Sequence, residues 1–372
     1  MEEAYPKKLL TRMLEIYSPS GCEGEISQFL AQEMASLGFE VSVDRVGNVL
    51  GRMGRGIHRV LFCGHMDTVE GAINVKQRGK VLFGRGAVDA KSSLAALICG
   101  AVKHRELGGE GGSVDVLAVV DEEGKSKGMK FFLSNAKETY DYAVFGEPSG
   151  AYALTIGYKG RIVLIVKIST LAGHASAPQL FENAIYVGLR LVDRFRDLET
   201  KWARRGGGDF FNIPTLCVTG MRGGSQDNTV PSQCELSLDI RIPPSIKLGE
   251  VKRKLIKVLE EFRLSELRAS MEYEFTDENE PYLEYSDSNL VKAFLQSIGE
   301  VVGKKGRLSR KTGTGDVNDF VKKFGTSSVV YGPGNSKLDH TPLENVSLQE
   351  YLDSIRVLEK VLGRLCSQAP TN

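Results

Sequence analysis

The chain has 372 residues, of which 41% are hydrophobic and 26% are charged, and its formal net charge is +1. This length exceeds what one small core requires, and it predicts two domains or one domain with a large insertion. The balanced charge excludes the basic surface that a nucleic acid or an anionic membrane attracts.

The lack of a recognisable targeting signal and the arrangement of the cysteines favour a cytoplasmic protein. No run of 18 apolar residues predicts a membrane span, and the first ten residues, MEEAYPKKLL, have the pattern of neither a signal nor a transit peptide. The six cysteines form no CxxC pair, and four of them lie inside apolar strand or helix patterns. We therefore expect reduced cysteines, no membrane contact and a cytoplasmic location.

The first part of the chain predicts strands that alternate with helices. Residues 4–36 have helical patterns, with a second helix that starts at Ser20 or a neighbour and is closed by Gly38. The segments that follow predict strands at 39–51, 58–64, 80–84, 114–120 and 141–147, and helices at 89–109 and 127–135. Such alternation is typical of an α/β sheet covered by helices on both faces.

The pattern changes after Gly157. Segments 161–170, 183–199, 215–224, 233–243, 248–264 and 269–278 predict the order βαββαβ, which is typical of a small α+β sandwich. Alternation of helix and strand returns in 288–303, 315–325, 327–332 and 347–363. The predicted layout is a mixed-sheet α/β domain, formed by residues 1–157 and 281–372, with an inserted α+β domain at 158–280.

The first candidate for chemistry is the phrase GHMDT at the end of a predicted strand. Strand alternation places His65 and Asp67 on the same side. A carboxylate beside a histidine can hold one ring tautomer and leave the other nitrogen free for a metal. The alternative is a hydrogen-bonded pair at a strand end.

Further acids and a histidine follow other predicted elements. Asp89 lies just before a helix, where an N-cap is the alternative role. In DEEG, one of the neighbours Glu122 and Glu123 can bind a metal while the other handles protons, although a solvated turn would have the same composition. Glu147 ends an apolar strand, and His340 lies in the loop GPGNSKLDHTP.

These residues are predicted to converge at one edge of the sheet. Four apolar strands are followed by histidine or acidic residues on their C-terminal side, where open α/β sheets bind ligands. Imidazole and carboxylate without thiolate suit zinc, cobalt or manganese. Asp89, Glu123 and Glu147 supply three negative charges, so two divalent cations and one hydroxide would give neutrality. Glu122 is then the spare carboxylate for proton transfer.

At this point the motifs resemble those of the M20 family of di-zinc peptidases and deacylases. The similarity runs through nearly the whole chain, in order, in the segments GHMDTV, GRGAVDAKSSLAA, DEEG, FGEPS, GYKGR, AGHASAP, NTVP, DIR and LDHTP. The resemblance implies two zinc or cobalt ions bridged by Asp89, with His65 and Glu147 on one ion and Glu123 and His340 on the other. It also implies a cis peptide bond after Asp89.

The resemblance assigns roles to further residues. Asp67 would orient His65, Glu122 would be the general acid and base, and His174 would polarise the scissile carbonyl, often in the partner subunit's active site. Asn228 and Arg241 would hold the substrate. The inserted domain would then be a lid and a dimerisation domain, and the protein a homodimer.

Within the family, GRGAVDAK, KTGTGD and YGPG…LDHTP most resemble hydrolases that release lysine or ornithine from an amino-group carrier protein (LysW). These enzymes cleave an amide on the γ-carboxyl of the carrier's C-terminal glutamate in lysine and arginine biosynthesis. The resemblance adds Thr312 and Gly313 as substrate-binding residues. The basic run KKGRLSRK (304–311) is either a solvated face or a docking surface for an acidic carrier.

Two kinds of alternative remain open. One is another M20 specificity, namely an N-acetylornithine or N-succinyl-diaminopimelate deacylase or a dipeptidase. The other is a catalytically silent metal-binding or scaffolding protein on the same fold. Glu122 argues against the silent protein, because binding alone needs no spare carboxylate.

Overall fold

The computed structural model describes residues 4–109, 111–205, 209–265 and 269–366, which form two compact units. Unit 1 comprises the described parts of Met1–Ile156, Glu284–Ser309 and Gly315–Asn372, and unit 2 comprises Gly157–Leu283 and Arg310–Thr314. Residues 310–314, which lie outside the predicted insertion at 158–280, group with unit 2. Within this unit, Arg241 Nη1 donates to Thr314 Oγ1.

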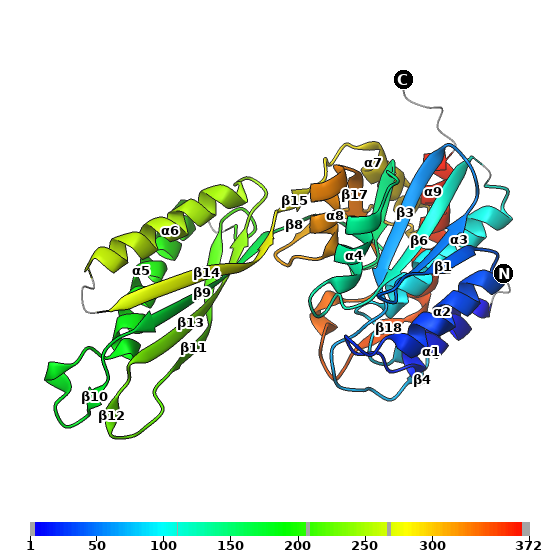
Figure 1. The fold of residues 1–372 in the computed structure, drawn as a ribbon. Coiled ribbons are helices and arrows are strands. Elements are labelled where there is room, and N and C mark those ends of the chain that lie inside the picture. The colour runs from blue at the N-terminus through cyan, green and yellow to red at the C-terminus, as the bar shows by residue number, and fades with distance from the viewer. Residues whose placement is uncertain (1–3, 110, 206–208, 266–268, 367–372) are drawn as a thin grey trace. The chain divides into compact units, whose positions relative to one another are not determined.

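A mixed sheet forms the centre of unit 1 (Figure 1). Its strands in spatial order are β1 (Glu40–Val43), β2 (Val49–Met53), β6 (Gly112–Val119), β3 (His58–His65), β7 (Tyr142–Phe145), β17 (Ser327–Val330), β8 (Ala153–Tyr158) and β15 (Tyr282–Leu283), and β16 (Arg307–Lys311) also pairs with β8. The four neighbours β6, β3, β7 and β17 are parallel, while β1, β2 and β8 pair antiparallel. The predicted mixed-sheet α/β class is confirmed.

Helices cover both faces of this sheet (Figure 1). They are α1 (Tyr5–Glu15), α2 (Gly24–Ser36), α3 (Lys91–Glu106), α4 (Lys127–Asn135), α7 (Asn289–Val302), α8 (Asp316–Phe324) and α9 (Leu348–Cys366). In β3, Val60 and Phe62 pack into the core with α1, α3 and α9, and Leu61 is buried on the other face. Burial on both faces explains the continuous apolar runs, and it leaves polar side chains to the loops after the strands.

A second, three-stranded sheet in unit 1 joins distant parts of the sequence. It has the order β18 (Asn345–Ser347), β5 (Val81–Phe83) and β4 (Lys76–Arg78). Val346 pairs with Leu82, and the short helix η2 (Ser336–Leu338) precedes this region. This pairing sets the chain around residue 344 beside the loop that begins at Gly84.

Unit 2 is an antiparallel sheet with two helices. Its strands in spatial order are β11 (Thr215–Gly223), β13 (Gln233–Ile242), β9 (Gly160–Ser169) and β14 (Ser270–Asn279), and its helices are α5 (Ala184–Arg205) and α6 (Leu248–Ser265). Alternate residues of β9 and β13 are buried with residues of both helices. The smaller elements are β10 (Gly173–His174), η1 (Pro178–Leu180), β12 (Thr229–Val230) and β15 (Tyr282–Leu283).

Across the described ranges, no helix has both the length and the apolar composition that a membrane span requires.

Candidate functional site

The candidate ligands follow the carboxyl ends of four adjacent parallel strands in unit 1. His65 is the last residue of β3, Glu123 follows β6, Glu147 follows β7 and His340 lies in the loop after β17. Because these strands run in the same direction, their loops emerge at the same edge of the sheet. Asp89 reaches this edge from the loop between β5 and α3.

The carboxylate of Asp89 faces a different histidine with each oxygen. Its Oδ1 lies 3.2 Å from Nε2 of His65, and its Oδ2 lies 3.2 Å from Nε2 of His340. Glu147 Oε1 is 3.5 Å from the His65 nitrogen, and Glu123 Oε1 is 2.8 Å from the His340 nitrogen. The structure thus brings all five predicted metal ligands together around Asp89.

The helix-cap alternative for Asp89 does not hold. The N-cap of α3 is Ala90, and no side chain caps this helix end. The peptide bond between Asp89 and Ala90 is cis, which confirms the cis bond that the resemblance implies. The Asp89 carboxylate therefore faces the histidines and not the helix.

The donor atoms suit a divalent cation. One ligand atom from each of His65, Asp89 and Glu123 lies within 4.8 Å of the others. Ligands about 2.0–2.1 Å from a tetrahedral zinc ion are roughly 3.3 Å from one another. The Asp89 oxygens and the two imidazole nitrogens, 3.2 Å apart in both pairs, match that separation. Nitrogen and carboxylate donors without thiolate also fit zinc or cobalt.

Hydrogen bonds within the cluster control its charges. Hydrogen bonding to Asp89 raises the pKa of His340 to about 9. Burial opposes the charge of Asp89, but its bonds to His340 and His65 hold its pKa below the usual range. Burial and the nearby Asp89 raise the pKa of Glu123. A cation that binds here would compete with protons for the histidine nitrogens.

The cluster opens to solvent on one side. The side chain of His65 is 1% exposed, whereas that of His340 is 51% exposed. Glu147 is 25% exposed and Glu123 10%. Within unit 1, the cluster is therefore accessible to solvent from the His340 side.

Asp67 connects His65 with the loop that carries Glu122 and Glu123. His65 Nδ1 lies 2.9 Å from the backbone oxygen of Asp67 and 3.5 Å from its Oδ1. The Asp67 carboxylate accepts the backbone N–H groups of Glu122 and Glu123, each at 3.1 Å, and the hydroxyl of Ser20 at 2.7 Å. The backbone carbonyl is thus the closer partner of the imidazole, and the carboxylate fixes the DEEG loop.

Glu122 directly precedes Glu123 and lies beside this cluster of histidines and acids. Burial, together with the charges of Asp316, Glu147 and Glu123, raises the pKa of its carboxyl well above the usual value, against the opposing charge of His65. A Cβ at Gly315 would lie 3.5 Å from Glu122 Oε1, so the start of α8 adjoins this carboxyl. A carboxyl with a raised pKa can both accept and return a proton near neutral pH.

Two of the remaining predicted residues lie together in unit 2. His174 pairs with Thr229 between β10 and β12, and the backbone oxygen of Asn228 accepts the N–H of Ala175 at 2.8 Å. The backbone N–H of Ser176 donates to His174 Nδ1 at 3.1 Å. In the neutral imidazole, Nδ1 is therefore the acceptor and Nε2 carries the proton.

Arg241 lies near the C-terminal end of β13, in the four-stranded sheet of unit 2. Its Nε and Nη2 donate to Asp239, at 2.6 and 3.2 Å, and its Nη1 donates to Thr314 Oγ1 at 3.1 Å. The predicted substrate-binding residues Thr312 and Gly313 directly precede Thr314. Along β13, Gln233 and Arg241 are eight residues apart, which is roughly 26 Å of strand. Unit 2 therefore does not bring His174 and Arg241 together.

Some residues around the cluster are not among those predicted from the sequence. Ser20 does not begin α2, whose N-cap is Glu23, because its hydroxyl binds Asp67 instead. The other unpredicted residues are Arg85, Glu344 and Asp316. The only sequence signal for Glu344 is an acid four residues after His340, and Asp316 ends the KTGTGD motif that contains Thr312 and Gly313.

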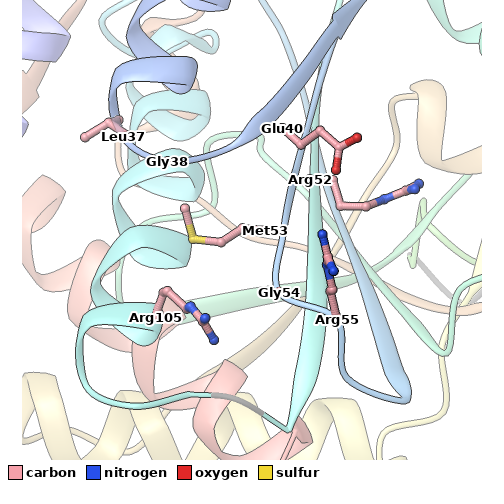
Figure 2. A pocket seen from close by; sticks show the side chains of 8 residues that line it. All are labelled: Leu37, Gly38, Glu40, Arg52, Met53, Gly54, Arg55 and Arg105. Atoms are coloured by element: carbon pink, nitrogen blue, oxygen red, sulfur yellow. The ribbon is translucent and has the colours of Figure 1, made fainter.

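A cavity of about 900 Å³ in unit 1 is separate from this site (Figure 2). It is lined by Leu37, Gly38, Glu40, Arg52, Met53, Gly54, Arg55 and Arg105. It lies at the start of β6, since Met53 pairs with Val114, whereas Glu123 follows the end of that strand. Arg52 is bound by Asp115 and Glu138. No predicted site residue lines this cavity.

Comparisons with known proteins agree with the geometry. The model of peptidase family M20/M25/M40 matches residues 61–364. A protein of Pyrococcus horikoshii is 36% identical over 96% of this chain and 97% of its own length. The LysW-lysine/LysW-ornithine hydrolase of Sulfurisphaera tokodaii is 32% identical over 97% and 95%. The crystal structure of an M20 family metallo-carboxypeptidase from Sulfolobus solfataricus has a TM-score of 0.82 at 19% identity, covering 98% of this chain and 100% of its own.

Proposed function

The chain belongs to peptidase family M20/M25/M40, and from that premise we propose that it is a metal-dependent amide hydrolase. Its substrate is lysine or ornithine joined to the γ-carboxyl of the C-terminal glutamate of an amino-group carrier protein (LysW), in lysine and arginine biosynthesis. The observation that carries the reaction class is the Asp89 carboxylate, which faces one histidine with each oxygen. The name of the Sulfurisphaera tokodaii relative supports the substrate.

Two divalent cations, zinc or cobalt, are proposed as cofactors. His65 and Glu147 would hold one cation, Glu123 and His340 the other, and Asp89 would bridge them. When bound, such cations polarise a carbonyl oxygen and lower the pKa of a water molecule. The spacing of the donor atoms supports this assignment, because it matches the separation expected between ligands of one ion.

Glu122 is proposed to move the proton of the reaction. Its carboxylate takes a proton from the attacking water and returns it to the leaving amine. Its raised pKa supports this role. Asp67 holds the backbone of Glu122 in position, which limits how far its carboxylate can move from the cluster.

His174 is proposed to stabilise the oxyanion that develops on the scissile carbonyl. The role requires a donor, and the bond from the Ser176 N–H to Nδ1 leaves the proton of the neutral ring on Nε2. A single donor of this kind contributes about 3 kcal/mol to transition-state stabilisation.

The proposed oligomer is a homodimer formed through unit 2, which then serves as the lid and dimerisation domain. The roughly 26 Å of strand between Gln233 and Arg241 supports this proposal. His174 and Arg241 of one chain cannot both contact one small amide. In a dimer, His174 of each chain can serve the partner's site.

Arg241 and its neighbours are proposed to bind the substrate, together with Asn228. Asp239 and Thr314 use three of the five N–H donors of Arg241 in the described contacts, so two donors remain for a carboxylate. Thr312 and Gly313 directly precede Thr314, whose hydroxyl accepts a hydrogen bond from this guanidinium, and they would contact the same part of the substrate.

Part of the basic run is proposed to attract the acidic carrier. Lys304, Lys305 and Arg307 are exposed. Arg310 lies 3.7 Å from Asp209 and over the ring of Phe211, so its charge is partly neutralised. The docking proposal therefore depends on Lys304, Lys305 and Arg307.

The location proposed for the protein is the cytoplasm.

A comparison of substrates tests the function. The purified protein, supplied with zinc or cobalt, is given carrier-linked lysine, carrier-linked ornithine, N-acetylornithine, N-succinyl-diaminopimelate and a dipeptide. We expect kcat/KM to be highest for a carrier-linked substrate. A preference for an acylated amino acid or a dipeptide would move the protein to another specificity of the family, and inactivity on all substrates would favour a silent metal-binding protein.

A further inference from the structure

Glu344 is a buried carboxylate that contacts the loop of one metal ligand from within the loop of another. Its side chain is fully buried. Its Oε1 accepts the backbone N–H groups of Gly86, Val88 and Asp89, at 3.0, 2.9 and 2.9 Å. Three donors thus converge on one oxygen, and the last of them belongs to Asp89 itself.

The second oxygen of Glu344 binds an arginine that reaches two further loops. Arg85 Nη1 donates to Glu344 Oε2 at 2.9 Å and to the backbone oxygen of Thr341 at 3.2 Å. Its Nε donates to the backbone oxygen of Gly71 at 2.9 Å. One ion pair therefore joins the loop of Asp89, the residue after His340 and the loop that follows Asp67.

The local backbone is built to direct its donors to Glu344. Gly86 has a φ of +87°, a conformation that glycine adopts at no steric cost. The backbone N–H of Gly84 also donates to the backbone oxygen of Glu344, at 3.4 Å. Pairing of β18 with β5 begins at the next residue, Asn345, so the position of Glu344 relative to the loop is fixed from both sides.

Asp89 and His340 are 251 positions apart in sequence, yet their side-chain atoms Oδ2 and Nε2 are 3.2 Å apart. The carboxylate of Glu344 binds both the backbone N–H of Asp89 and the guanidinium of Arg85, which in turn binds the backbone oxygen of Thr341. Resting on the metal site proposed above, we propose that Glu344 is a positioning residue. It sets the separation between Asp89 and His340, and thereby the affinity of the site that these two residues share.

A glutamine at this position cannot make the same contacts. If its carbonyl oxygen accepts the three backbone N–H groups, its NH₂ group points at the guanidinium of Arg85, and two donors then face each other. If the amide is turned over, the NH₂ group faces the three backbone donors. Glu344→Gln therefore keeps the size of the side chain but loses either the contact with Arg85 or the contacts with the three backbone N–H groups.

The test compares Glu344→Gln with the control Glu284→Gln. Glu284 is also buried, and its carboxylate accepts the backbone N–H groups of Ser328 and Tyr285, at the start of β17 and away from the ligand loops. Zinc binding to each metal-free protein is measured by calorimetry. Hydrogen exchange of residues 84–89 and 338–344 is measured on the same metal-free samples.

We expect Glu344→Gln to weaken the lower-affinity zinc site by about 10–100-fold, the usual effect of losing an outer partner of a metal ligand. Exchange should increase in both loops, and Glu284→Gln should change neither property. The proposal is overturned if Glu344→Gln binds zinc as the unmodified protein does, or if both variants lose affinity equally. Should Glu344→Gln not fold, Glu344→Asp keeps the charge on a shorter side chain, and the same two results decide.

Zinc uptake by the unmodified protein is read separately. Uptake of fewer than two ions per chain would contradict the proposed function. The role of Glu344 is judged by the difference between variants, and the exchange measurement does not require metal.

Discussion

The Oδ1 atom of Asp67 accepts the backbone N–H of Glu122 at 3.1 Å. Asp67 thus contacts His65 through its backbone oxygen and also fixes the backbone of Glu122, the proposed general base. This contact links the backbone of Glu122 to the loop after the proposed ligand His65, so a substitution of the Glu122 side chain should leave the cluster intact.

Glu122→Gln should retain the metal and the fold but lose most of kcat. The amide keeps the shape of the side chain and cannot carry a proton between water and the leaving amine, an effect of about 10²–10⁴-fold. The measurement is kcat on carrier-linked lysine together with metal content. A variant that turns over at more than a tenth of the normal rate would show that another group moves the proton.

Asp89→Asn and His340→Ala should differ in the number of cations lost. Asp89 faces both histidines, whereas His340 contacts Asp89 and Glu123 only in the described pairs. We expect Asp89→Asn to lower zinc content from two ions per chain to fewer than one, and His340→Ala to leave about one. Elemental analysis after dialysis gives the ratio. Equal losses in both variants would argue against a bridging Asp89.

His174→Ala should lower kcat by about 10²–10³-fold, the usual effect of losing one donor to an oxyanion. His174 lies in β10, which pairs with β12 just before the Gln233 end of β13, whereas Arg241 lies near the other end of β13. We therefore expect the donor to act in the partner's site. Mixed dimers of His174→Ala and Glu122→Gln should then regain activity, since one site in each mixed dimer has both residues. Verified mixed dimers without activity would place His174 in the site of its own chain.

Asp316→Asn should change how stability depends on pH. Burial is the main cause that raises the pKa of Asp316 from its ordinary 3.8 to about 7, against the opposing effect of Ser126. Between these values the folded state binds more protons than the unfolded state, so the unmodified protein loses stability as pH rises from about 4 to about 7.

Asp316→Asn removes this contribution. Relative to the unmodified protein, the variant should gain stability across that interval, on the order of 4 kcal/mol in total. Urea unfolding of both metal-free proteins at several pH values measures the difference. Two parallel stability curves would mean that Asp316 titrates normally.

Exchange of two lysines tests the docking of the carrier. Lys304→Glu with Lys305→Glu should lower kcat/KM for carrier-linked lysine several-fold at low salt, because opposite charge accelerates encounter. The difference should shrink as salt is added. The control exchanges the exposed Lys125 and Lys137, which lie outside this run. An equal effect of the control pair, or none in either, would exclude a specific docking role for the run.

The strand pattern and the ligand types could be predicted from the sequence. Apolar runs that end abruptly at His65, Glu123 and Glu147 indicate buried strands with polar loops at one edge, because a strand buried on both faces has no place for charge. The two adjacent glutamates of DEEG also predict one carboxylate for a metal and one for proton transfer, a division that stays a prediction. These inferences depend on neighbours in sequence, and such neighbours fix strand direction and side.

Only the tertiary structure decided which atoms meet. Three observations depend on contacts between distant segments. Asp89 faces two histidines, and the carboxylate of Asp67 binds the DEEG loop more closely than it binds the imidazole. Glu344 accepts three N–H groups from a loop more than 250 residues away. Neither hydrophobic periodicity nor motif spacing predicts these contacts, because they form only when β18 pairs with β5 and the four parallel strands align. The sequence by itself determined the kinds of ligand and the edge of the sheet where they lie, and folding determined their distances.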